Sequence, residues 1–336
     1  MLSGLVASVL LLAPAASASP PVAAAPQAPE APAVGKRARV PANLLRPLPT
    51  KGGIPRMVPE HRRPGTPEQW ARYDATFAAV KSRSFAGTAT SKARDAGLET
   101  VRSSVDPASF ESMYGALRGQ KHDVLLAVLD AFAKGGTEGQ FALASVAIQD
   151  PDAAIRAEAT RRLQQPPSDA VLAAIDDGLR STNHDWIDRA GILAGATHAV
   201  EAIPALIFAQ SANTSDGTER GDRAWIAIGR TISYVQNVVP VVGDNAAGFQ
   251  PVIGQLIEGV VMQVQDCVVT IYHGGVHDSL VAMTTYDSGS DTGKLAWDMR
   301  AWARWFNETY VPLKQREDKE LAQAAAAAAT ASTGAP

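Results

Sequence analysis

Apolar residues recur with a helical period from residue 66 onward. The first run has side chains three or four residues apart, and its members are Trp70, Tyr73, Phe77 and Val80. This spacing places them on one face of a helix. Thr66 followed by Pro67 predicts where that helix begins, because Thr caps free amide groups and Pro suits the first helical position. A second apolar stripe follows Asp106-Pro107. Both stripes are typical of core-facing helices.

A short motif recurs with a fixed period between residues 120 and 230. Its three copies are residues 150–159, 183–193 and 222–227, and each contains an arginine at the same motif position. These arginines are Arg156, Arg189 and Arg223, with spacings of 33 and then 34 residues. A repeat of this length predicts stacked pairs of helices, because one pair alone cannot bury its apolar face. The arginines should then lie in register along one side of the stack.

The motif resembles the HEAT repeat, especially its short bacterial form. The resemblance is carried by the first copy, through Asp150, Pro151, Ile155, Arg156 and Ala159. It implies that Asp and Pro begin an inner helix and that Arg makes a polar contact within the stack. The second copy departs from the pattern at Trp186 and Asp188, and the third keeps only Asp-Arg-Ala. The resemblance covers about 110 residues and implies a short HEAT-like α-solenoid. A helical bundle without repeats is the alternative.

After residue 228 the helical period of apolar residues gives way to an alternation of apolar and polar residues. Val260, Met262 and Val264 alternate with Gln263 and Gln265, as in a half-buried strand. Residues 242–248 read as a turn, and residues 268–272 and 280–285 as two further strands. Residues 228–287 are therefore predicted to form a small antiparallel β module. Because the end of a repeat array exposes apolar surface, this module could cap it.

The helical pattern returns in residues 288–320. One predicted helix face gathers four aromatic residues, which are Trp302, Trp305, Phe306 and Tyr310. Arg300 and Arg304 lie off that face, as in an amphipathic helix. We expect at least two of Trp302, Trp305 and Phe306 to be buried, although an exposed platform for a sugar or a partner is the alternative. This ending resembles that of secreted HEAT-repeat proteins of unknown function from planctomycete-type bacteria. Residues 321–336 form an Ala-rich tail.

The N-terminal 65 residues indicate export and a linker. An apolar run at residues 2–13 leads to Ala16-Ser17-Ala18, which predicts a signal peptide over residues 1–18, although no basic residue precedes the run. Residues 19–65 are rich in Pro and Ala and then basic, which favours a disordered linker. We therefore expect a secreted or periplasmic protein with no integral membrane span after cleavage.

The segment 36–63 carries eight Lys and Arg residues against a single acidic residue, Glu60. It could adhere to an anionic surface polymer or lipid. It could instead be a solvated linker that folds back onto an acidic body. The whole chain has a formal net charge of −3, which argues against a dedicated nucleic-acid binder.

Candidate chemistry is sparse. His273, His277 and Asp278 could together supply three metal ligands, although Gly274-Gly275 between the histidines favours a loop. The single cysteine, Cys267, excludes an intrachain disulfide and reads as a small buried residue of a strand. The Asp176-Asp177 pair reads as a solvated helix flank. The chain contains no G-x-S-x-G, P-loop or G-x-G-x-x-G motif.

Together these patterns predict an α+β protein: a helical HEAT-like repeat array over residues 66–227, the β module and the aromatic helix. We expect a non-enzymatic scaffold without a cofactor that binds a protein partner. Its candidate binding residues are Trp302, Trp305, Arg156, Arg189 and Arg223. One alternative is a metal-dependent hydrolase that uses His273, His277 and Asp278. Another is a cell-surface anchor that holds an anionic polymer through residues 36–63.

Overall fold

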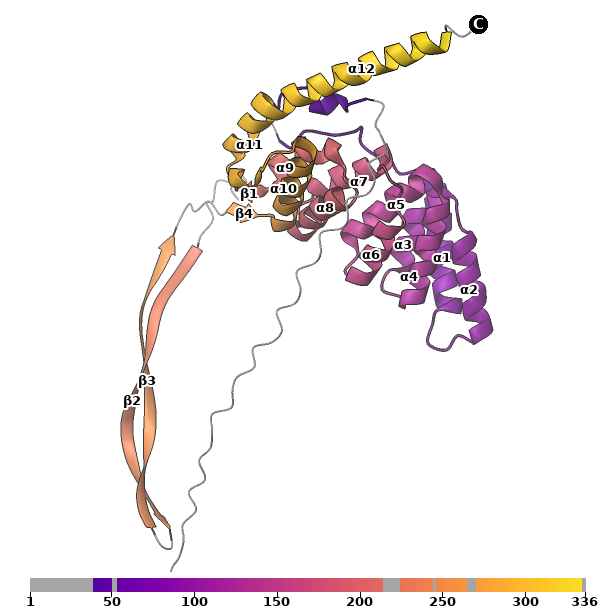
Figure 1. Cartoon of the computed structure of the whole chain (residues 1–336). Coiled ribbons are helices and arrows are strands. Elements are labelled where there is room, and N and C mark those ends of the chain that lie inside the picture. Colours follow the sequence, from indigo (N-terminus) through magenta and orange to yellow (C-terminus); the bar gives the residue numbers. More distant parts are fainter. Residues whose placement is uncertain (1–38, 50–52, 214–223, 244–245, 265–269, 334–336) are drawn as a thin grey trace, which may run out of the picture. The chain divides into compact units, whose positions relative to one another are not determined.

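The computed structural model describes residues 39–49, 53–213, 224–243, 246–264 and 270–333. Most of these residues are helical, and the strands form antiparallel pairs, which agrees with the predicted α+β class (Figure 1). The signal peptide, most of the Pro/Ala-rich segment, Cys267 and Arg223 lie outside the described residues. Among the described helices, none combines the length and the apolarity that crossing a bilayer requires.

In the part of the chain that the structure describes, nine α-helices precede the strands. They are α1 (Pro67–Ser84), α2 (Ser91–Ser103), α3 (Phe110–Leu117), α4 (His122–Lys134), α5 (Gly136–Gln149), α6 (Ala153–Arg161), α7 (Asp169–Leu179), α8 (His184–Ala196) and α9 (Ile203–Ala209). After the strands come α10 (Gly274–Ser288), α11 (Met299–Trp305), a π-helical turn (Phe306–Tyr310) and α12 (Val311–Thr333). The last helix runs unbroken through the predicted boundary at residue 320 into the Ala-rich tail.

Side-chain caps begin α1, α6 and α8. The start of α1 is as predicted, whereas α6 begins at Ala153, two residues after the Asp150-Pro151 pair that the resemblance implied. Thr66 accepts a hydrogen bond from the Gln69 amide, the Gln69 side chain accepts one from the Thr66 amide, and Pro67 follows. Asp152 caps α6 in the first motif copy, and Asn183 caps α8 in the second. Each cap satisfies amide groups that a helix leaves free at its first turn.

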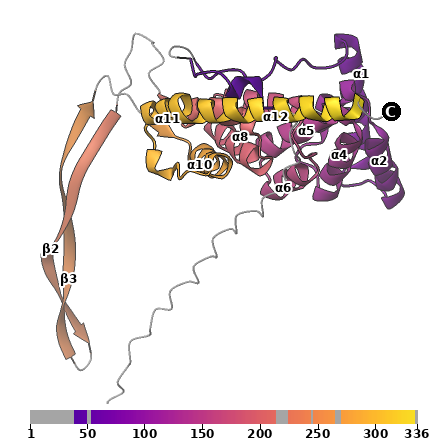
Figure 2. The ribbon, with the colours of Figure 1, turned by 45° about the horizontal axis from the view of Figure 1, so that its top comes forward.

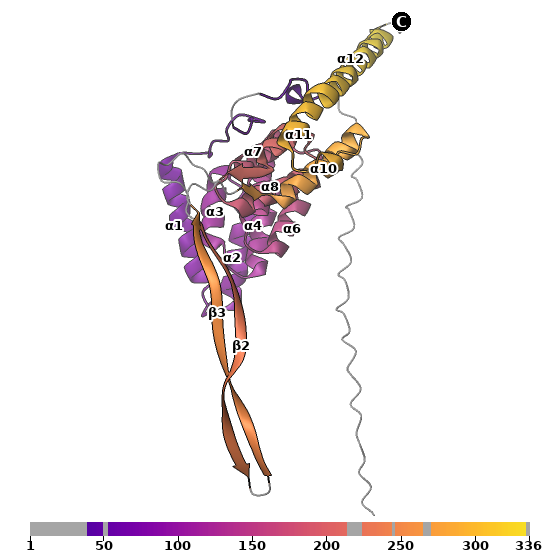
Figure 3. The ribbon, with the colours of Figure 1, turned by 90° about the vertical axis from the view of Figure 1, so that its left-hand side faces the viewer.

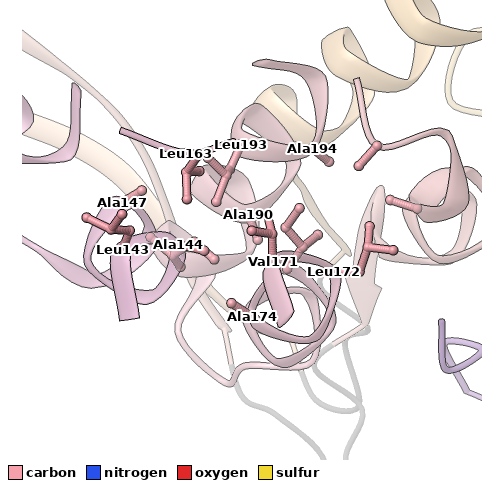
Figure 4. Packing of buried hydrophobic residues seen from close by; sticks show 14 of the residues in the cluster. Leu143, Ala144, Ala147, Leu163, Val171, Leu172, Ala174, Ala190, Leu193 and Ala194 are labelled. Carbon is pink, nitrogen blue, oxygen red and sulfur yellow. The ribbon is translucent and has the colours of Figure 1, made fainter. Parts of the chain in front are cut away.

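The helices pack in two rows. In one row α3 packs against α5, α5 against α7 and α7 against α9. In the other, α2 packs against α4 and α4 against α6, while α8 packs against α10. The core between α5, α7 and α8 consists of small and branched side chains, which let the helices approach closely (Figure 4). Leu143, Val171 and Ala190 there are fully buried, and burial of each large side chain contributes roughly 1.5–3 kcal/mol.

The strands form two separate antiparallel pairs. β1 (Ser211–Asn213) pairs with β4 (Thr270–Tyr272). β2 (Ala224–Gly243) pairs with β3 (Ala246–Val264) along nearly their whole length. Of the predicted turn at 242–248, residues 242–243 and 246–248 lie in the paired strands, and residues 244–245 lie outside the described residues. The two long strands coil about each other, as two-stranded ribbons do (Figure 3).

The structure corrects two of the predicted strand and repeat boundaries. Residues 280–285, predicted as a strand, belong to α10, where Val276, Leu280 and Met283 are buried at helical spacing. A short apolar run is compatible with the period of a helix and with that of a strand. Packing against α8 favours the helix here. Residues 224–227, predicted as part of a third repeat, lie in β2 and pair with residues 261–264. The helices before the strands therefore end at Ala209, and α10 packs on α8 in place of that repeat.

The crossing of α8 and α10 depends on glycines. A Cβ atom added at Gly191 would lie 2.6 Å from the Val276 Cα, and one at Gly195 would lie 2.9 Å from the Ser279 hydroxyl oxygen. Both distances are too short for atoms that do not bond, so only Gly allows the backbones this approach. Asp188, which departs from the HEAT pattern, accepts a hydrogen bond from the Gly275 amide at 2.8 Å at the start of α10.

The prediction of a disordered linker is wrong for the residues that the structure describes between 39 and 65. Residues 39–49 and 53–65, called the strap below, lie along the helices, and part of the strap runs beside α12 (Figure 2). Val40, Leu44 and Leu48 of the strap are buried in the core. The Leu48 amide donates to the Asn307 Oδ1 at 2.8 Å. These three apolar residues are spaced four apart inside a basic and Pro-rich segment.

The aromatic helix is docked as predicted. Trp302, Phe306 and Tyr310 are fully buried, and Trp305 is partly buried. The Trp302 Nε1 donates to the Ala296 carbonyl oxygen at 2.7 Å. Since α11 packs against α9, the aromatic face is buried against helices, where the sequence predicted a sheet.

Candidate functional site

A pocket of about 270 Å³ opens between the strap and helices α3, α5 and α7. The strap supplies His61, Arg63 and Pro64 to its wall. The helices supply aromatic side chains, which are Phe110, Tyr114, Phe132 and Phe141. They also supply three carboxylates, which are Glu111, Glu138 and Asp177. A concave, largely apolar site with a few polar groups is the usual form of a binding pocket.

Asp176 holds the strap in place beside the pocket. Its side chain is almost fully buried on α7, contrary to the predicted solvated flank. The Met57 amide of the strap donates to its Oδ1 at 3.3 Å, and the Arg180 Nε donates to its Oδ2 at 2.9 Å. Arg56 of the strap adds a guanidinium at 3.7 Å. Because a buried carboxylate is costly without partners, this set of donors fixes the strap relative to α7.

Two strap side chains complete the pocket wall. The His61 ring stacks on Phe141 with 3.5 Å between the ring centroids, and its Nε2 lies 2.8 Å from the Glu138 Oε2. The Arg63 Nε lies 3.0 Å from the Glu111 Oε2, and its guanidinium lies over the Trp70 ring. The basic residues predicted to bind an anionic polymer are thus, at Arg56 and Arg63, already paired with acidic groups of the helices.

Tyr114 connects the pocket with the first motif copy. Its hydroxyl donates to the Asp150 Oδ2 at 2.7 Å, and Asp150 is buried. Burial and this hydrogen bond raise the pKa of Tyr114 above its ordinary value. Tyr114 therefore stays a neutral donor and gives the pocket no acid–base group at physiological pH.

Asp177 differs from the other carboxylates of the pocket. Glu138 and Glu111 each face a strap side chain, whereas Asp177 has no hydrogen bond or ion pair with any residue that the structure describes. Asp177 is exposed to solvent at the pocket wall. Partial desolvation there raises the pKa of Asp177, and the negative charge of Asp176 raises it further. A carboxylate that lacks a partner beside aromatic rings suits a cationic group carried on an apolar stem.

The repeat arginines make structural contacts. The Arg156 Nη1 donates to the carbonyl oxygens of Asp150, at 3.0 Å, and Pro151, at 2.9 Å. The Arg189 Nη1 reaches the Asp150 carbonyl oxygen at 3.2 Å. Both arginines therefore lie on the same side of this loop, and Arg223 lies outside the described residues.

The predicted metal ligands do not converge. His273 is buried, with its Nδ1 2.7 Å from the Ala209 carbonyl oxygen and its Nε2 3.0 Å from the His184 Nδ1. The His277 Nδ1 lies 2.7 Å from the Gln210 Oε1, and Asp278 is exposed. Within the described residues, no three His, Cys, Asp or Glu side chains are grouped as metal ligands. Gly274 and Gly275 begin α10 and do not form the predicted loop.

Burial lowers the pKa of His277, which leaves its ring neutral near pH 7. The ring stacks on Trp297 at 4.0 Å between centroids. Trp297 and Tyr272 are exposed, with their rings 5.0 Å apart, so they form the accessible aromatic surface at this end. The predicted platform residue Trp302 lies beneath, fully buried.

No sequence pattern indicated the pocket. The predicted solvated flank is correct for Asp177, which is exposed, and wrong for Asp176, which is buried, while His61 was predicted to lie in a linker. Tyr114 and Asp150 are 36 positions apart in the sequence, and no local pattern indicates that they meet. No protein-family model, curated protein or solved structure matches this chain.

Proposed function

We propose that this chain is an exported, non-enzymatic scaffold that binds a protein partner by receiving one cationic side chain of that partner in the strap pocket. The observation that carries the proposal is Asp177, a carboxylate without a described partner at the wall of an aromatic pocket. A Lys or Arg side chain would place its apolar stem against Phe141 and Tyr114 and its charge near Asp177.

The proposal includes a short HEAT-like solenoid as the framework. It is supported by the two rows of helices and by the shared acceptor of Arg156 and Arg189, which is the Asp150 carbonyl oxygen. In such arrays one row of helices carries the binding surface. The pocket draws most of its helical residues from α3, α5 and α7, which belong to one row, and Phe132 from α4 of the other row.

Export is part of the proposal and rests on the apolar run at residues 2–13 and on Ala16-Ser17-Ala18. The mature chain would begin near Ser19. N-terminal sequencing of the protein from its native host tests this, and an intact Met1 on cytosolic protein would contradict it.

Binding can be tested with two labelled peptide libraries. In one, a central Lys or Arg is flanked by apolar residues; in the other, norleucine replaces the central residue. We expect binding of the cationic library by fluorescence anisotropy and about tenfold weaker binding of the norleucine library. Asp177→Asn should weaken the cationic peptides by about the same factor. Asp95→Asn, a change at an exposed residue of α2, is the matched control.

Acidification provides an independent readout. Because the pKa of Asp177 is raised, its charge is lost at a higher pH than that of an ordinary Asp. Peptide binding should therefore weaken as the pH falls through that range, and Asp177→Asn should remove this pH dependence. Equal binding of both libraries, or an unchanged affinity in the Asn variant, would rule out the pocket as the site.

A further inference from the structure

The hairpin of β2 and β3 has a length that its own pairing does not explain. The strands contain 20 and 19 residues, whereas strands in globular proteins average roughly 5–6. In the part of the chain that the structure describes, this sheet has two strands, so each of them has one edge without a partner strand. A lone two-stranded hairpin is only marginally stable in water, and long free edges favour pairing with another chain.

The hairpin contains few of the residues that usually prevent an edge strand from pairing with another chain. Residues 224–264 contain three charged residues, which are Arg230, Asp244 and Glu258, and no Lys. Natural edge strands are commonly protected by Lys, by other charges or by Pro. The hairpin contains two prolines, Pro240 and Pro251, and its two halves differ in whether they contain one of them.

Both prolines lie in the half near the turn. Pro240 pairs with Phe249, and Pro251 pairs with Val238. Both pairs lie on the turn side of a register shift between Val235 and Asn237, and the base of the hairpin lies on its other side. Since Pro has no amide hydrogen, each must occupy a position whose amide would point away from the partner strand. Each proline thus removes a donor from one outer edge near the turn. The base, residues 224–235 and 253–264, contains no Pro.

The two charged residues of the base favour one way of pairing strands between two copies of the chain over the others. Arg230 and Glu258 are directly opposite in the register. If β2 of one copy pairs antiparallel with β3 of the next at the same level, Arg230 meets Glu258 of that copy. Pairing β2 with β2, or β3 with β3, at that level would bring like charges together, which is unfavourable.

We infer that this hairpin joins copies of this chain, through antiparallel pairing of the base of β2 with the base of β3 of the next copy. This contact is heterologous, because it uses a different edge on each copy. It therefore continues beyond a dimer, into a closed ring or an open filament. The inference is independent of the strap pocket.

The test exchanges charges between copies of the full chain. Arg230→Glu gives a hairpin with two acidic residues at this level, and Glu258→Arg gives one with two basic residues. Sedimentation velocity should show wild-type assemblies larger than a dimer and each variant alone shifted toward the monomer. An equimolar mixture of the two variants should assemble again. In the mixture each variant still has two like charges opposite each other within its own hairpin. Renewed assembly would therefore result from the contact between copies and not from a repaired hairpin.

A backbone variant covers the case in which a charge variant fails to fold. Along β3 the outward amides have the parity of Pro251, so Gln255→Pro removes an outward donor in the base. It should reduce assembly while the helical circular-dichroism signal and its melting stay unchanged. A monomeric wild type, variants that assemble like wild type, or a mixture that stays monomeric would each overturn the inference.

Discussion

Arg156 and Arg189, from consecutive motif copies, donate to the same backbone oxygen, that of Asp150. Their Nη1 atoms lie 3.0 and 3.2 Å from it. Asp150 follows α5, where a helix end leaves carbonyl groups without helical partners. The two side chains therefore tie α6 and α8 to the end of α5: Arg156 bonds within its own motif copy, and Arg189 bonds to the preceding one.

Removal of both arginines should cost more stability than the two single changes together. Arg156→Ala or Arg189→Ala alone should lower the free energy of unfolding by about 1–3 kcal/mol, since one donor remains for the Asp150 oxygen. The double variant leaves that oxygen without a donor, so its loss should exceed the sum. Urea denaturation measures all three, with the exposed Arg300→Ala as the control. An additive double variant would show that the shared acceptor is energetically unimportant.

Gly191→Ala should destabilise the protein because its new Cβ would meet the Val276 backbone. Such overpacking typically costs about 1–3 kcal/mol. Gly115→Ala is the matched control, since Gly115 is a helical glycine with open space around it. That change should be neutral or stabilise by up to about 1 kcal/mol. Equal denaturation midpoints for the two variants would contradict the close crossing of α8 and α10.

Trp302→Ala should lower the free energy of unfolding by about 3–5 kcal/mol, as expected for truncation of a fully buried aromatic side chain. It also leaves the Ala296 carbonyl oxygen without its indole donor. Trp305→Ala should cost less, because that side chain is only partly buried. Calorimetry compares the two, and an undiminished melting temperature in Trp302→Ala would mean that the aromatic face is not docked.

Leu44→Ala separates an anchored strap from a disordered linker. Leu44 is fully buried, so its truncation should cost about 2–5 kcal/mol and make the strap more sensitive to protease. The exposed Arg46→Ala should change neither property. A Leu44→Ala variant as stable and as protease-resistant as wild type would restore the linker interpretation.

Asp177→Asn should raise stability at neutral pH while it weakens binding. The folded state raises the pKa of Asp177, so it disfavours the ionised carboxylate relative to the unfolded chain. Wild type therefore loses stability as the pH rises from the ordinary Asp pKa through the raised one. The Asn variant cannot ionise and keeps that stability.

Thermal melts from acid to neutral pH check this expectation. The two proteins should differ at pH 7 and converge below the ordinary Asp pKa, where both states of wild type are protonated. Asp95→Asn should follow wild type throughout. A variant that melts below wild type at pH 7 would show that Asp177 stabilises the fold.

The sequence by itself determined features set by neighbouring residues. The capping of α1, α6 and α8 follows from Thr66, Asp152 and Asn183, because each side chain bonds to amides two or three residues ahead. The buried aromatic face of residues 302–310 likewise follows from local composition and from the helical period.

Only the tertiary structure decided the rest, because the deciding partner lies far along the chain. Residues 280–285 fit either period, and packing on α8 makes them helical. The strap is ordered because Leu44 and Leu48 find the core and Met57 finds the buried carboxylate of Asp176. The candidate site arises in the same way: α7 brings Asp177, and the strap brings His61, to one pocket. No local pattern encodes that meeting, since its energy comes from contacts that exist only after the chain has folded.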